Sequence, residues 1–233
     1  MDIFATIQGL VPCTFRALVQ GVHARHSVVR DFCAGHTLEL RPRDKGKWGK
    51  MVEFHLFGRL PNNDPLPDLG VAVGDIKATH FKQTRDGWTA KERLTVTNCG
   101  STANYDSFRN LLVDMKESSL YPKLRRGMLV ALEHGTHPDV WDECVLGIVH
   151  YDLEALPEEM QAVLRDDYAK IQHRIRTQTV SQSGQQFLHI HPHGSKGSST
   201  RALGFTNKFV TQLLCYYTNR TVRVCGRSWV FSI

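Results

Sequence analysis

The sequence predicts an α/β protein in which a mixed sheet is flanked by helices. Several segments rich in β-branched residues are bounded by turn residues, which indicates strands. Segments with apolar residues at helical spacing precede, separate and follow them. The 233 residues are 41% hydrophobic and 22% charged, as in an ordinary globular protein. This length suits a single domain over residues 1–233, built either as one unit or as two lobes.

The expected helices begin at suitable capping residues. Asp2 and Thr14 can each cap a short amphipathic helix near the N-terminus. Pro157 and the two glutamates after it suit the first turn of a longer helix. Beyond the two N-terminal helices, we expect helices over residues 47–58, 157–175 and 207–217.

The expected strands alternate with these helices and with polar loops. Pro, Asn and Asp mark residues 61–68 as a loop, and Gly and Ser mark residues 194–200 as another. Together the helices and strands predict the mixed sheet. The strands are expected over residues 69–79, 91–98, 127–134, 143–151 and 186–193, with a further strand in the tail at 220–231.

Charge and cysteine usage limit the functional class. The net charge of +6 and the isoelectric point near 9.1 fit a polyanionic partner without proving one. No apolar run approaches the roughly 18–20 residues of a membrane span, and the N-terminus lacks a secretory signal, so we expect an intracellular protein without membrane contact. The six cysteines are scattered without a CxxC pair, which predicts buried, reduced thiols.

The segment DLGVAVGDIK (residues 68–77) carries the clearest chemical pattern. Side chains alternate along a strand, so Asp75 and Lys77 share a face and emerge together. Asp68 joins them only if the preceding loop folds back. Two carboxylates can hold Mg²⁺ against a phosphate, and a neighbouring lysine can orient the attacking water. The alternative is a surface salt bridge between Asp75 and Lys77 worth about 0–1 kcal/mol.

DLGVAVGDIK also resembles the metal-binding strand of the MutH family of mismatch-repair nicking endonucleases, which share a fold superfamily with type II restriction enzymes, GATC-cutting ones included. Asp68, Asp75 and Lys77 match the family spacing of an Asp, six residues and an acid-x-Lys. The family usually carries Glu at the position of Asp75. The resemblance implies a restriction-endonuclease-like core with a cleft between two lobes.

Further blocks in the same order extend the resemblance over roughly residues 3–215. RDKGKWGKMVEF is similar to a family segment that places Lys45 as a DNA-facing cation and Glu53 as a third metal-site acid. KERLTV places Glu92 near the site, and SSLYPKLRRGMLVALEH places a functional lysine at Lys123. NKFVTQLL resembles the final helix, and we include its Lys208 among the expected DNA-binding residues.

QFLHIHPHGSKGSSTRALGF is similar to the DNA-reading strand and loop of the family. Its glycines and serines allow close approach to phosphates, and Lys196 and Arg201 add positive charge. The family has Arg at the position of His191, Lys at that of His193, and an aromatic residue at that of Thr206. Histidine contacts predict stronger DNA binding at mildly acidic pH, and these departures leave GATC specificity and methylation sensitivity open.

Three functional hypotheses follow. The leading one is a Mg²⁺-dependent, sequence-specific endonuclease for double-stranded DNA, acting either by MutH-like nicking with a mismatch-repair partner or by type II restriction. It would work as a monomer or as a DNA-induced dimer. The second is a non-catalytic DNA-binding protein on the same scaffold. The third is a zinc site formed by His189, His191 and His193, which alternate on one strand face.

Overall fold

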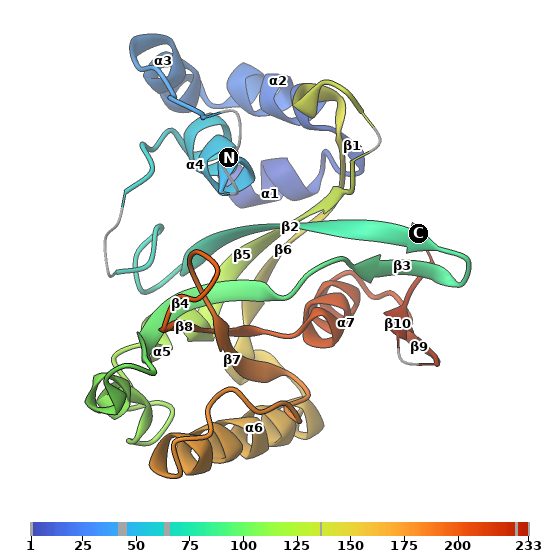
Figure 1. The fold of residues 1–233 in the computed structure, drawn as a ribbon. Coiled ribbons are helices and arrows are strands. Elements are labelled where there is room, and N and C mark those ends of the chain that lie inside the picture. The colour runs from blue at the N-terminus through green and yellow to red at the C-terminus, as the bar shows by residue number, and fades with distance from the viewer. Residues whose placement is uncertain (1, 42–45, 63–65, 136, 227, 233) are drawn as a thin grey trace.

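A five-stranded mixed sheet forms the centre of the computed structural model, which describes residues 2–41, 46–62, 66–135, 137–226 and 228–232. The strand order is β1-β6-β5-β2-β3 (Figure 1). The central strands β2 and β5 run parallel, and every other pair is antiparallel. The five strands are β1 (Cys13–Thr14), β2 (Asp75–Thr84), β3 (Gly87–Ala90), β5 (Arg126–Glu133) and β6 (Cys144–Asp152).

Two smaller antiparallel sheets accompany the central one. A three-stranded sheet has the order β4-β8-β7 and lies below the central sheet in Figure 1. A hairpin of β9 and β10 lies near the C-terminus. These strands are β4 (Leu94–Ser101), β7 (Leu188–Pro192), β8 (Thr200–Phe205), β9 (Arg223–Cys225) and β10 (Ser228–Val230).

Helices cover both faces of the central sheet. The four N-terminal helices α1 to α4 form a layer on one face, whereas α6, α7 and the β4–β8–β7 sheet lie on the other (Figure 1). The helices are α1 (Ile3–Gln8), α2 (Phe15–Arg25), α3 (Ser27–Gly35), α4 (Lys47–Phe57), α5 (Tyr121–Arg125), α6 (Glu158–Arg176) and α7 (Asn207–Tyr217). Three short 3-10 helices are η1 (Tyr105–Leu111), η2 (Val140–Asp142) and η3 (Leu153–Ala155).

Each face of the central sheet has its own hydrophobic core. Along β5, Met128, Val130 and Leu132 belong to the core under the helical layer. Leu129 and Ala131 belong to the core on the opposite face. This alternation is the two-residue period of a strand buried on both sides.

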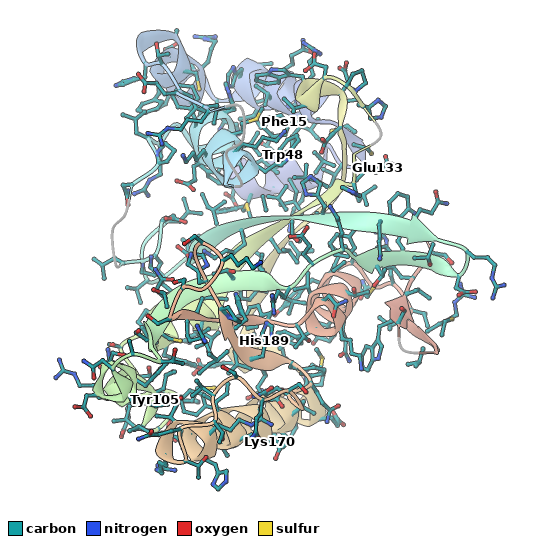
Figure 2. The ribbon with its side chains drawn as sticks, viewed as in Figure 1. Phe15, Trp48, Tyr105, Glu133, Lys170 and His189 are labelled. Carbon is teal, nitrogen blue, oxygen red and sulfur yellow. The ribbon has the colours of Figure 1, made fainter. Side chains whose placement is uncertain are left out.

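Aromatic packing joins the helices of the helical layer. Phe15 and Trp48 meet edge to face with ring centroids 5.3 Å apart, and both lie in this layer in Figure 2. His189 is labelled in the same view on the other side of the central sheet. The two cores therefore fix the helical layer and the β4–β8–β7 sheet on opposite faces of β2.

The predicted helices are confirmed, together with both N-terminal caps. The Asp2 carboxylate accepts from the Phe4 amide at 3.1 Å, and the Thr14 hydroxyl accepts from the Ala17 amide at 3.2 Å. Helices α4, α6 and α7 lie where residues 47–58, 157–175 and 207–217 were expected. The α/β class with flanking helices is therefore as predicted.

Several strand boundaries differ from the prediction. The strand expected over residues 69–79 is wrong in its first half, because residues 68–74 form turns and β2 begins at Asp75. Helix α3, strand β3 and strand β8 were not predicted. Strand β8 begins at Thr200, so the Gly/Ser loop is followed by a strand rather than leading directly to the last helix.

Two further predictions concern the oxidation state of the cysteines and the presence of membrane-spanning helices. All six cysteines are free, as predicted, but only Cys99 and Cys215 are buried, and the other four are half-buried. Within the described ranges, the structure contains no helix with the length and apolar character needed to cross a membrane.

Candidate active site

A tight turn over residues 67–74 brings the two aspartates of DLGVAVGDIK together. The Gly70 amide donates to the Pro67 carbonyl at 2.9 Å, and the Gly74 amide donates to the Gly70 carbonyl at 2.7 Å. Gly74 has φ +104°, and a Cβ there would clash with the Arg126 carbonyl oxygen of β5. Glycine therefore allows the close approach of the turn to β5.

Reciprocal hydrogen bonds then fix Asp68 against the start of β2. The Asp68 amide donates to Asp75 Oδ1 at 3.1 Å. In return, Asp68 Oδ2 accepts from the Ile76 amide at 3.0 Å. The fold-back that the sequence prediction required is therefore present, and its cause is the turn rather than strand alternation.

Lys77 completes this group from the same face of β2. Its Nζ lies 2.6 Å from Asp75 Oδ2, with side-chain exposures of 17% for Lys77 and 2% for Asp75. Ile76 points to the opposite face, into the core under the helical layer. This contact confirms that Asp75 and Lys77 share a face, and its burial distinguishes it from the exposed salt bridge weighed as the alternative.

Glu53 reaches the same site from helix α4. Met51 and Val52 on α4 are buried in the helical-layer core, whereas Glu53 is only partly buried and lines a pocket of about 480 Å³. Asp68, Asp75 and Lys77 line this pocket, which we call the acidic pocket. Its other lining residues are Asn62, Ile76, Thr95, Val96, Thr97, Asn98, Lys123 and His193.

The acidic residues of this pocket differ in the direction of their pKa shifts, with Glu53 and Asp68 raised and Asp75 lowered. Burial and the charge of Asp68 raise the pKa of Glu53 to about 7, against the opposing effect of Lys77. Burial and the adjacent Asp75 carboxylate also raise the pKa of Asp68. Burial acts to raise the pKa of Asp75. The positive charge of Lys77 and the hydrogen bonds that the Asp75 carboxylate accepts outweigh this effect, so the pKa of Asp75 is lowered. A cation in this pocket would relieve the repulsion among the acids.

The donor set fits a hard cation such as Mg²⁺. Asp68 and Asp75 offer carboxylate oxygens, which Mg²⁺ prefers, and the open pocket leaves room for the waters it retains. Glu53 lies farther away. In the described ranges, these three acids do not form a group whose ligand atoms all lie within 4.8 Å of one another. Oxygens on one Mg²⁺ are at most about 4.2 Å apart, so direct coordination by all three acids would need a side-chain rotation, whereas a contact of Glu53 through water would not.

Strand β4 supplies a polar wall that the sequence prediction did not include. Thr95, Thr97 and Asn98 line the acidic pocket opposite the start of β2. The segment was predicted to be a strand, and the alternation of Thr95 and Thr97 was the available signal. Only the packing of β4 against β2 shows that this wall faces the aspartates.

Of the expected DNA-binding residues, Lys123 and His193 line the acidic pocket. Lys123 lies on α5, and His193 is exposed at the end of β7. Glu92 lies in a neighbouring pocket of about 350 Å³, which shares Glu53 and Lys77 with the acidic pocket. The Glu92 carboxylate is exposed and lies 3.5 Å from Lys91 Nζ.

Three other expected DNA-binding residues form hydrogen bonds within the fold, and His191 is also buried. His191 is only 4% exposed, and its Nε2 lies 2.9 Å from the Thr95 hydroxyl. The Thr206 hydroxyl caps α7 by accepting from the Phe209 amide, and it donates to the Gln186 carbonyl. The Arg201 guanidinium donates to the carbonyls of Ser198 and Thr200 at 3.0 Å each.

Two of the remaining expected DNA-binding cations, Lys196 and Lys208, are not part of the acidic pocket. Lys196 is exposed on the loop between β7 and β8, and Lys208 is exposed in the first turn of α7. Neither lines the acidic pocket. Lys45 lies outside the described residues.

The predicted histidine face is present in part, as a contact between His189 and His191. His189 and His191 share a face with ring centroids 4.7 Å apart. Burial and nearby positive charge lower the pKa of His189 to about 4 and that of His191 to about 3, so both are neutral at mildly acidic pH. The burial of His191 and its contact with Thr95 therefore do not favour the acid-enhanced DNA contact expected of it, which stays a prediction. Within the described residues, the three histidines do not form a cluster with metal-binding spacing.

A comparison with protein-family models finds no family that matches this chain, and a comparison with curated proteins finds no match.

Proposed function

We propose that the protein is a Mg²⁺-dependent, sequence-specific endonuclease that hydrolyses phosphodiester bonds in double-stranded DNA. The observation that carries the proposal is the Lys77–Asp75 contact of 2.6 Å beside Asp68, in a pocket open at the surface. Two carboxylates that can hold Mg²⁺ beside a lysine are a combination that can support phosphodiester hydrolysis. The resemblance of DLGVAVGDIK to the metal-binding strand of the MutH family supports the same proposed activity.

Each side chain would have a distinct task. Mg²⁺ held by Asp68 and Asp75 would neutralise charge on the scissile phosphate and acidify a bound water. Lys77 would donate a hydrogen bond to the attacking water or to a phosphate oxygen, because its Nζ lies beside Asp75 and lines the same pocket. Glu53 would hold water at the edge of the site.

The DNA backbone would lie along the basic and polar rim of the acidic pocket. Lys123 and His193 can contact phosphates there, with Thr95, Thr97 and Asn98 as hydrogen-bond partners. Lys196 and Lys208 would add charge at a distance, which makes affinity fall as salt rises. We further propose a restriction-endonuclease-like core in which this pocket is the floor of a DNA cleft.

Cleavage of supercoiled plasmid by the purified protein tests the activity. We expect nicked or linear product with Mg²⁺ and none with EDTA. Asp75→Asn and Lys77→Met should each lower the rate at least about 100-fold, as expected for loss of a charge-stabilising group. Asp166→Asn on the exposed face of α6 and Lys82→Met on the exposed part of β2 are the matched controls. Wild-type rates in both Asp75→Ala and Lys77→Ala would rule the proposal out.

The same assay separates the remaining alternatives. One active site per chain gives a single nick, so accumulation of nicked plasmid supports MutH-like action with a mismatch-repair partner. Linear product at low enzyme concentration, with a DNA-induced dimer on gel filtration, supports restriction-type cleavage. Mapping the cut ends on methylated and unmethylated plasmid tests GATC specificity. Tight duplex binding without cleavage in any divalent cation would instead support a non-catalytic DNA-binding protein.

A further inference from the structure

A second group of metal-ligand side chains lies in the helical layer. His23 of α2, Cys33 of α3 and His55 of α4 each offer one ligand atom, and these atoms all lie within 4.8 Å of one another. It is the one group of three or more histidine, cysteine or acidic side chains at that spacing in the described ranges. We propose that His23, Cys33 and His55 form a binding site for Zn²⁺ or a similar borderline cation, distinct from the acidic pocket.

The donor types specify the class of metal. Two imidazoles and a thiolate suit Zn²⁺ and related transition metals, whereas Mg²⁺ takes oxygen ligands. Tetrahedral zinc has ligand atoms about 3.5 Å apart. Closing separations of at most 4.8 Å to that value requires shifts of no more than about 1.3 Å, which side-chain rotation can supply. Three protein donors leave the fourth position for water.

The site lies at the C-terminal end of α4, where the helix favours positive charge. Cys33 Sγ donates to the Phe54 carbonyl at 3.2 Å, and His23 Nε2 lies 3.0 Å from the His55 carbonyl oxygen. These carbonyls belong to the last turn of the helix, which carries a partial negative charge. A cation held by the three side chains would therefore gain electrostatic stabilisation from the helix.

Aromatic side chains shield the site on one side. The His55 ring lies 4.8 Å from Trp141 and 4.9 Å from Phe54, centroid to centroid. His23, Cys33 and His55 are themselves only partly buried, so a cation can enter from solvent. An apolar shell beside a solvent-accessible donor set strengthens metal–ligand electrostatics. A bound cation would cross-link α2 and α3 to the helix that carries Glu53.

Cobalt substitution and cysteine protection in the full-length protein test this site. We expect the metal-free wild type to bind one equivalent of Co²⁺ with a sulfur-to-cobalt charge-transfer band, which Zn²⁺ removes. Zn²⁺ should also slow iodoacetamide alkylation of Cys33 at least about tenfold, because the thiolate is bound. Alkylation of Cys13, half-buried on β1 and packed against the core under the helical layer, should not change.

Single-residue variants distinguish Co²⁺ binding at His23, Cys33 and His55 from Co²⁺ binding elsewhere on the protein. Cys33→Ser and His55→Gln should lose the cobalt band, whereas Cys13→Ser and His36→Gln should keep it. Asp75→Asn should keep it too, so failure of the nuclease proposal would leave this one standing. Absence of the cobalt band together with an unchanged rate of Cys33 alkylation in the wild type would overturn the proposal. His23 and Cys33 would then serve only as hydrogen-bond partners for the carbonyls in the last turn of α4. The alkylation measurement needs no variant to fold.

Discussion

The carboxylates of Asp68 and Asp75 each accept a hydrogen bond from a backbone amide at or next to the other residue. The Asp68 amide donates to Asp75 Oδ1, and the Asp68 carboxylate accepts from the amide of Ile76, the residue after Asp75. The turn over residues 67–74 and these two hydrogen bonds thus hold the pair together. The geometry of the acidic pocket depends on whether that turn can form.

Gly74→Ala should disrupt the turn. Gly74 has φ +104°, and the added Cβ would clash with the Arg126 carbonyl of β5. We expect a loss of at least about 3 kcal/mol in the free energy of unfolding, measured by urea denaturation, because strain and clash add. Gly70→Ala is the control, since Gly70 has φ +79° but open space around it, and should cost about 1 kcal/mol. Equal losses in both variants would contradict the role of the close approach.

Tyr151→Phe should leave stability nearly unchanged. Tyr151 is fully buried, and its hydroxyl has no hydrogen-bond partner among the described residues. It lies beyond Gly127, which is opposite Asp75 in the sheet. Removal of an unpaired buried hydroxyl should change the free energy of unfolding by less than about 1 kcal/mol.

Tyr217→Phe is the matched comparison for Tyr151→Phe. The Tyr217 hydroxyl accepts from the Asp152 amide at 2.9 Å and donates to the Asp152 carbonyl at 2.8 Å. Its removal should cost about 1–2 kcal/mol. A larger loss for Tyr151→Phe than for Tyr217→Phe in parallel denaturation curves would show that the Tyr151 hydroxyl has a partner, such as water.

Asp167→Asn should destabilise the protein strongly. The Asp167 side chain is fully buried and accepts from the amides of Gln186, Phe187 and Leu188 at 2.5–3.0 Å. An asparagine amide would point a donor at these donors, and we expect a loss of about 3 kcal/mol or more in thermal or urea unfolding. The neighbouring Asp166, exposed and paired with Lys170, provides the control Asp166→Asn, which should change stability by less than about 0.5 kcal/mol.

His191→Gln should weaken the loss of stability in acid. The pKa of His191 lies at about 3 in the folded protein, below the value of about 6.5 in an unfolded chain. The unfolded state therefore binds more protons below pH 6.5, and folding loses up to about 1.4 kcal/mol per pH unit from this group as the pH falls.

The comparison that tests this effect is the difference in unfolding free energy between His191→Gln and wild type at pH 7.5, 6 and 5. Other groups, including Glu53 with its raised pKa, titrate in both proteins and cancel in the difference. The variant should gain relative stability as the pH falls. His36→Gln, at the exposed end of α3, should run parallel to wild type. A constant difference for His191→Gln would show that His191 is already charged or exposed.

The sequence by itself determined the features that depend on local periodicity. Capping at Asp2 and Thr14 set the first helices, and two-residue alternation placed Asp75 beside Lys77. Local patterns suffice for these features because the residues that interact are only a few positions apart along the chain. Glu53, by contrast, was indicated by the family resemblance of RDKGKWGKMVEF.

The tertiary structure alone decided which of these segments meet. The fold-back of Asp68 depends on a glycine turn packed against β5, and the polar wall of β4 depends on pairing with a strand over 100 residues later. His191, which was predicted to contact DNA, is buried and lies against the Thr95 hydroxyl of β4. His23, Cys33 and His55 have no motif spacing, because three separate helices bring them together. Contacts over such sequence distances arise from packing of the two cores, which local patterns do not encode.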